Sequence, residues 1–215
     1  MEKIPELFAS IYEKATRLVV KTYYAEVAEE VVSHLKGGMI LDLGTGPGYL
    51  PIQIAKRSEA ISICGIDLSK SLIEMAQLNA LKEGLDRRVR FEIGSASNLP
   101  FESETYDMVI STGMLHMVKD PVKVLKESYR VLKQGSEAWF YDPAQISSRA
   151  DPGKWKESFN LKERIIYALF PLYQRINPPH YYTRKEIEEI ISSTPFHVIE
   201  IEQRGREFKI KLKKV

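Results

Sequence analysis

A buried-strand pattern that runs directly into a glycine-rich turn constrains the fold of this chain more than any other feature of its sequence. The segment, residues 40–49, reads Ile40-Leu41-Asp42-Leu43-Gly44-Thr45-Gly46-Pro47-Gly48-Tyr49. Three alternating glycines let a ligand approach the backbone closely. Tyr49 stands where the dinucleotide fingerprint G-x-G-x-x-G has its third glycine, and Pro47 has no N–H to offer a phosphate. With the carboxylate of Asp42 just before the turn, the loop is typical of a site for a zwitterionic or cationic ligand that carries a nucleoside.

The size and composition of the chain favour one globular domain spanning residues 1–215. The sequence is 44% hydrophobic and 28% charged, and its net charge of +2 neither demands nor excludes an anionic partner. Its one cysteine cannot form an internal disulfide, which favours a reducing compartment. No apolar run approaches the ~18 residues of a membrane span, and the N-terminus does not resemble a signal peptide. We therefore expect a cytoplasmic protein.

Strand and helix patterns alternate after residue 38, which predicts an α/β fold with a parallel sheet covered on both faces. The predicted fold class is a Rossmann-like, doubly wound, mostly parallel seven-stranded sheet with an antiparallel C-terminal hairpin and helices on both faces. The predicted strands cover 39–43, 61–67, 89–93, 106–111, 138–141, 196–203 and 207–213.

Helix start and stop signals divide the chain into four segments. They are N-terminal amphipathic helices at 5–36, a ligand-binding core at 38–143, a helical insert at 150–180, and a last helix with the hairpin at 183–215. Either Ser69 or Ser71 is a predicted helix cap, and Asp120-Pro121 predicts a helix start with Gly135 after its end. Thr183 with Glu186 has the spacing of a capping box.

A doubly wound sheet binds its ligand at the carboxyl ends of its strands. The second predicted strand ends in Asp67, whose carboxylate suits the two hydroxyls of a ribose. The third ends in Gly94-Ser95-Ala96, where a short polar side chain and a backbone N–H suit an adenine edge. The fourth ends in Ser111-Thr112-Gly113 and the fifth in Asp142-Pro143.

Four of these segments resemble the motifs of class I S-adenosylmethionine-dependent methyltransferases with small-molecule or quinone-type substrates. They are LDLGTGPG at 41–48, GIDLS at 65–69, GSASNLPF at 94–101, and YDMVIS followed by LHMVKDPVKVLKESYRVLKQG within 106–135. Together they cover about residues 38–143 in the order and spacing of the family.

The resemblance implies S-adenosyl-L-methionine as cofactor and assigns its contacts. The methionine end would be held by Asp42, Gly44, Thr45, Gly46 and Gly48, and lined by Ser111, Thr112 and Gly113. Asp67, followed by Leu68, would hold the ribose, and Ala96 would offer its N–H to the adenine. Relatives usually carry aspartate at the position of Ser95, so this chain departs from the pattern there. An N-terminal tyrosine, here Tyr12 or else Tyr23 or Tyr24, would reach the cofactor carboxylate.

The sequence identifies no general base. His116, Tyr12 and His180 are candidate catalytic residues; His116 has the alternative of a turn residue beside the cofactor, and His180 that of a solvated loop residue. Six tyrosines (Tyr12, Tyr23, Tyr24, Tyr141, Tyr181 and Tyr182) are expected to supply an aromatic pocket. No metal is expected, because Ser111 occupies one place where catechol-type methyltransferases need an acid, and no histidine–carboxylate spacing resembles a metal site.

The acceptor is expected to be a small molecule, and O-, N-, S- and C-methylation all remain open. The apolar insert at 150–180 is a packed helix, a substrate lid or, through 155–176, a peripheral membrane contact. Nucleic acid is not favoured as a partner, because the net charge is small and the C-terminal lysines alternate along a strand. The alternatives are an RNA or protein methyltransferase, an NAD(P)-dependent oxidoreductase, and a catalytically inactive cofactor-binding protein. The sequence does not define an oligomeric state.

Overall fold

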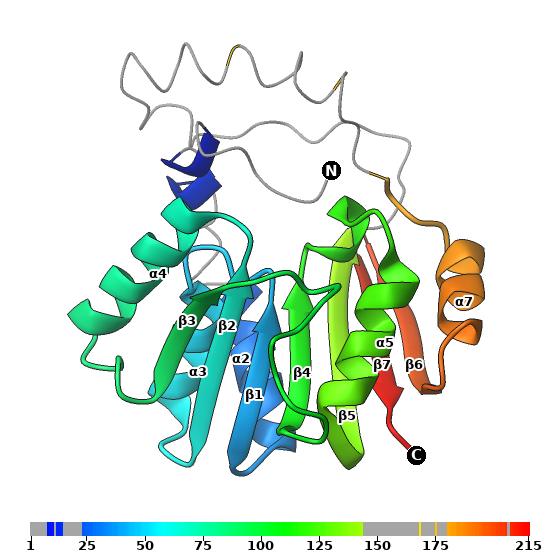
Figure 1. The fold of residues 1–215 in the computed structure, drawn as a ribbon, viewed down its shortest axis with the longest axis horizontal. Helices are drawn as coiled ribbons and strands as arrows, with labels where there is room; N and C mark the ends of the chain where they lie inside the picture. The colour runs from blue at the N-terminus through cyan, green and yellow to red at the C-terminus, as the bar shows by residue number, and fades with distance from the viewer. Residues whose placement is uncertain are drawn as a thin grey trace.

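The computed structural model describes residues 8–10, 12–14, 23–143, 168, 175, 180–205 and 207–215. Its centre is a seven-stranded sheet in the order β3-β2-β1-β4-β5-β7-β6 (Figure 1). The strands are β1 (Gly38–Leu43), β2 (Ile61–Asp67), β3 (Val89–Ile93), β4 (Tyr106–Thr112), β5 (Leu132–Pro143), β6 (His197–Arg204) and β7 (Glu207–Lys213). The first five are parallel, and β7 runs antiparallel between β5 and β6. This confirms the predicted doubly wound sheet with its C-terminal hairpin.

Helices cover both faces of the sheet. On one face lie α2 (Ala25–His34), α3 (Tyr49–Arg57) and α4 (Lys70–Lys82), and on the other lie α5 (Pro121–Val131) and α7 (Arg184–Ser192) (Figure 1). Neighbouring residues along β1 pack on opposite faces of the sheet. Ile40 belongs to the core under α2 and α3, and Leu41 belongs to the core under α5 and α7. Burial on both sides explains why the strands read as continuous apolar runs.

The predicted caps begin three of these helices. Ser69, rather than Ser71, caps α4 by accepting the Leu72 N–H at 3.4 Å. Asp120 caps α5 by accepting the Lys123 N–H at 2.9 Å, ahead of a proline at the first helical position. Thr183 and Glu186 form the complete capping box of α7.

The predicted end of the helix before β5 is wrong. We expected Gly135 to follow the helix and the next strand to cover 138–141, but α5 ends at Val131 and β5 begins at Leu132. Leu132 pairs with Tyr106 on β4, and the Gly135 N–H donates to the Lys214 carbonyl. Backbone pairing with residues distant in the sequence thus makes this polar segment part of β5. Gly135, with φ 79°, lies inside the strand.

One predicted segment falls almost entirely beyond this description. The insert at 150–180, with its alternative readings as lid, packed helix or membrane contact, lies outside the described residues except for Ala168, Arg175 and His180. In the described parts of the chain, the helices are all too short or too polar to cross a membrane.

Candidate functional site

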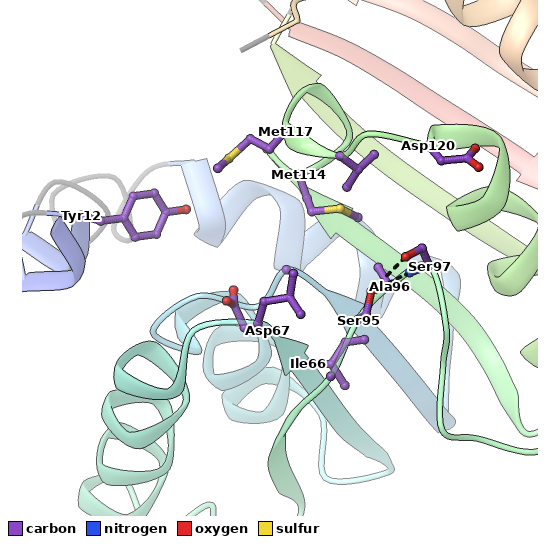
Figure 2. A pocket seen from close by; sticks show the side chains of 14 residues that line it. Tyr12, Ile66, Asp67, Ser95, Ala96, Ser97, Met114, Met117 and Asp120 are labelled. Atoms are coloured by element: carbon purple, nitrogen blue, oxygen red, sulfur yellow. Dashed lines mark hydrogen bonds between the residues drawn. The ribbon is translucent and has the colours of Figure 1, made fainter. Parts of the chain in front are cut away.

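A pocket lies where the carboxyl ends of β1 to β4 meet (Figure 2). Seven of the residues predicted to contact a cofactor line it: Tyr12, Gly44, Asp67, Leu68, Ser95, Ala96 and Gly113. The remaining lining residues, which the sequence did not single out as site residues, are Ile66, Gly94, Ser97, Met114, Met117, Val118 and Asp120. Asp67 and Asp120 are the charged side chains among these lining residues, and both are acidic, so the wall favours a cationic ligand.

The backbone N–H groups of the glycine loop are already occupied within the protein. Gly44 and Thr45 both donate to the Ile66 carbonyl at 2.9 Å, and Gly48 donates to the Thr45 carbonyl at 3.0 Å. Gly46 donates to Asp67 Oδ2 at 3.0 Å, and Pro47 has no N–H. A phosphate cradle needs several convergent N–H donors. The loop therefore does not have the chemistry of a pyrophosphate site.

Asp67 links the loop that follows β1 to the turn that follows β2. Its Oδ2 accepts the Gly46 N–H, and its Oδ1 accepts the Ser69 N–H at 2.8 Å. These two bonds hold the Asp67 carboxylate in a fixed orientation at the pocket wall. Two acceptors held rigidly at the pocket wall suit a pair of adjacent hydroxyls.

Asp42 lies beneath the glycine loop and is only 2% exposed. Its Oδ1 and the Thr45 Oγ1 are both buried, and neither has a hydrogen-bond partner among the described residues. Burial, together with repulsion from Asp67, raises the pKa of Asp42 to about 7, although the adjacent Thr45 side chain partly offsets the rise. Unpaired buried polar atoms are costly, so this pair is better satisfied when a ligand supplies hydrogen-bond donors.

Tyr12 contacts the glycine loop from the N-terminal segment. A Cβ at Gly46 would lie 3.3 Å from Cε1 of the Tyr12 ring, and Gly46 itself has φ 54°. Figure 2 shows Tyr12 on one side of the pocket, opposite the turn that carries Met114 and Met117. The left-handed backbone favours glycine at this position, and the ring of Tyr12 leaves little room for a side chain.

Ser95 holds its own loop together at the far wall. Its Oγ lies 2.9 Å from Ser97 Oγ and accepts the Ser97 N–H at 3.3 Å (Figure 2). The sequence feature that could have identified Ser97 as a pocket residue is its place two residues after Ser95. For Met114 and Met117 that feature is their three-residue spacing, which is the spacing of one turn. Asp120 was noted only as a helix cap.

Six predicted contacts are not among the pocket-lining residues: Asp42, Thr45, Gly46, Gly48, Ser111 and Thr112. Ser111 is 1% exposed and donates its hydroxyl to the Leu43 carbonyl at 2.8 Å, so it ties β4 to β1 beneath the pocket wall.

Of the six tyrosines expected to supply an aromatic pocket, Tyr12 lines the pocket, and burial raises the pKa of Tyr24, with Tyr12 and Asp42 close enough to raise it further. Tyr141 lies on the α2 side of the sheet and donates to Glu30, while Tyr182 packs in the opposite core. The alternation of side chains along β5 explains why Tyr141 faces away.

The candidate catalytic histidines have different surroundings. His116 Nδ1 lies 3.2 Å from Oδ1 of the buried Asp142. His180 is 63% exposed at its side chain and pairs with Glu186 on α7. The sequence placed Asp142 at the end of a strand but did not indicate this pairing, since 26 residues separate the partners. Within the described residues, no three His, Cys, Asp or Glu side chains gather as a metal site.

Comparisons with known proteins agree with this geometry. A family model described as "Methyltransferase domain" matches residues 34–204. A ubiquinone/menaquinone biosynthesis C-methyltransferase of Geotalea daltonii is 29% identical over 141 residues, 62% of this chain and 60% of that protein. Arsenite methyltransferase of Rattus norvegicus is 33% identical over 150 residues, 65% of this chain and 40% of that protein.

The fold also matches solved structures. A crystal structure described as a putative S-adenosyl-L-methionine-dependent methyltransferase from Methanococcus maripaludis superposes with a TM-score of 0.74 at 22% identity, covering 100% of this chain and 95% of that chain. At this identity the likeness concerns the fold. The chain spans about 60% of the length of the curated relatives it matches first.

Proposed function

The chain belongs to the methyltransferase-domain family, and from that premise we propose that it transfers a methyl group from S-adenosyl-L-methionine to a small-molecule acceptor. The observation that carries the proposal is the buried Asp42 carboxylate, whose Oδ1 has no hydrogen-bond partner among the described residues, below a glycine loop whose N–H groups are occupied. Such a site suits a cation and disfavours a phosphate. When bound, S-adenosyl-L-methionine supplies an electrophilic methyl group on a positively charged sulfur.

Residues that line the pocket, together with Asp42 and Thr45 beneath the glycine loop, would each contact a different part of the cofactor. Asp42 and Thr45 would accept hydrogen bonds from its ammonium group, with Gly44–Gly48 shaping the approach. The two orientated oxygens of Asp67 would accept the ribose hydroxyls, next to Leu68.

The adenine and the remaining methionine atoms would lie against the other walls of the pocket. Ser95 and the Ala96 N–H would face the adenine edge. Gly113 and Tyr12 would flank the methionine part and its carboxylate, with Thr112 next to Gly113 and Ser111 supporting the wall from behind.

Catalysis in such a site is mainly positioning. The methyl group is already activated, so the protein has to hold the acceptor in line with it and exclude water. The acidic wall favours the cationic donor over its neutral product. The segments at 5–36 and 150–180 are the proposed lid material, and residues 38–143 are the proposed cofactor-binding core.

The protein's location is a separate proposal. Its single cysteine, Cys64, supports a reducing compartment, and we place the protein in the cytoplasm on that ground.

Isothermal titration calorimetry tests the proposed cofactor. We expect saturable binding of S-adenosyl-L-methionine and of its demethylated product, and no detectable heat with NADH at the same concentrations. The occupied N–H groups of the loop give the physical reason for the NADH result. Binding of NADH without S-adenosyl-L-methionine would establish the oxidoreductase alternative instead.

A further inference from the structure

A histidine–aspartate pair lies next to the pocket and has no part in holding the cofactor. His116 belongs to the short 3-10 helix η3 (Leu115–Met117), and both Met114, which precedes this helix, and Met117 line the pocket. One oxygen of Asp142 lies 3.2 Å from His116 Nδ1, and the other accepts the His116 backbone N–H at 3.0 Å. Asp142 thereby fixes both the turn and the orientation of the ring.

The carboxylate also selects the tautomer of His116. A carboxylate only accepts hydrogen bonds, so Nδ1 carries the hydrogen and Nε2 keeps its lone pair in the neutral ring. No hydrogen bond to Nε2 occurs within the described residues. Burial raises the pKa of Asp142, and the facing His116 ring opposes that rise.

Other titratable groups surround the ring from three elements. The Tyr181 ring stacks on His116 with centroids 5.4 Å apart and planes 18° apart. The His180 N–H donates to the His116 carbonyl at 3.0 Å, while its own ring pairs with Glu186 on α7. The Tyr182 hydroxyl lies 3.4 Å from the Leu115 carbonyl. Within the described residues, Asp142 is the carboxylate that contacts the ring.

We propose that His116 Nε2 accepts the proton that the acceptor loses during methyl transfer, and that Asp142 positions it; this inference rests on the proposed function. The nucleophilic atom of the acceptor bonds to the methyl carbon while the methyl–sulfur bond breaks and its electron pair goes to sulfur. The proton of that nucleophilic atom passes to Nε2, and the imidazolium formed is stabilised by Asp142 until water takes the proton.

This role defines the class of acceptor. Its attacking atom carries a hydrogen, as in a phenol or a thiol. A tertiary amine or a thioether has no proton to lose and would gain nothing from His116.

The tautomer can be tested without an acceptor. In protein labelled with 15N-histidine, long-range 1H–15N spectra should assign the neutral His116 ring a hydrogen on Nδ1. In Asp142→Asn the amide nitrogen can donate to Nδ1, so the tautomer should invert to Nε2–H. An Nε2–H tautomer in the wild type would overturn the proposal.

Turnover then tests the chemical role, with catechol as the probe acceptor and release of the demethylated cofactor as the signal. His116→Gln should lower turnover by about 100-fold or more, while its dissociation constant for S-adenosyl-L-methionine stays within about twofold of the wild type. The pH profile of the variant should lose the limb at which turnover of the wild type falls with acid. His197→Gln, an exposed histidine on β6, is the matched control and should behave like the wild type.

The two proposals fail differently. Loss of S-adenosyl-L-methionine binding by the wild type would sink the proposed function. Wild-type turnover that His116→Gln retains, with an unchanged pH profile, would sink the role of His116 alone.

Discussion

We expect the titration of Asp42 to connect folding to binding of the proposed cofactor. Its pKa of about 7 lies well above the ordinary value near 3.8, because it is buried and faces Asp67. Between about pH 4 and pH 7 the unfolded chain ionises this acid while the folded chain retains the proton. The ligand-free protein should therefore lose stability as pH rises through this range.

A cationic ligand reverses that balance, because it stabilises the carboxylate and displaces the proton. We expect S-adenosyl-L-methionine to bind up to about tenfold more tightly per pH unit between pH 5 and 7, with release of up to one proton. Calorimetry in buffers of different ionisation enthalpy measures that proton. Asp42→Asn should abolish its release, whereas Asp86→Asn, at an exposed position, should not. Affinity that is flat in pH would refute the linkage.

At the scale of elements, α3 begins where the glycine loop packs against its neighbours. Gly48 caps this helix with φ 77°, and a Cβ there would lie 2.5 Å from Phe91 Cζ and 2.9 Å from Ala76 Cβ. Gly84 has a similar φ of 68° with no atom within 4 Å of such a Cβ. A comparison of the two positions therefore distinguishes the energetic cost of backbone strain from the cost of overpacking.

Alanine at each position should reveal that difference. Gly84→Ala should cost about 1 kcal/mol of unfolding free energy, from the left-handed backbone alone. Gly48→Ala should cost about 1–3 kcal/mol more, because its methyl group overpacks the contact with β3 and α4. Urea denaturation measures both. Equal losses of unfolding free energy in the two variants would show that the side chains around Gly48 move aside without cost.

Across the whole molecule, a charge network links α2 to the C-terminal hairpin. Glu30 pairs with Lys209 and, at 3.0 Å, with Lys211, and it accepts the Tyr141 hydroxyl at 3.0 Å. Partial burial alone would raise the pKa of Glu30, but these hydrogen bonds outweigh burial and lower it to about 2. The lowered pKa means that its stabilisation is present above about pH 4 and is lost as pH falls towards 2.

Glu30→Gln should therefore lower the unfolding free energy by about 1–2 kcal/mol at pH 7. The difference from the wild type should shrink as the pH is lowered from 5 to 3. Glu29→Gln on the same helix is the control, because its side chain is 70% exposed and, within the described part of the chain, pairs only with Arg57 at 3.5 Å. Its effect should stay within about 0.5 kcal/mol. A pH-independent loss at Glu30 would point to packing rather than charge.

The sequence by itself determined the alternation of strands and helices, three helix caps, the C-terminal hairpin and the glycine loop with Asp42 and Asp67. These features depend on residues a few positions apart, so local periodicity and backbone preferences reveal them. Only the tertiary structure decided that the loop N–H groups are occupied, that β5 begins at Leu132, and that Asp142 orients His116. Those outcomes depend on contacts between residues far apart in the chain, which form only when neighbouring strands align in register.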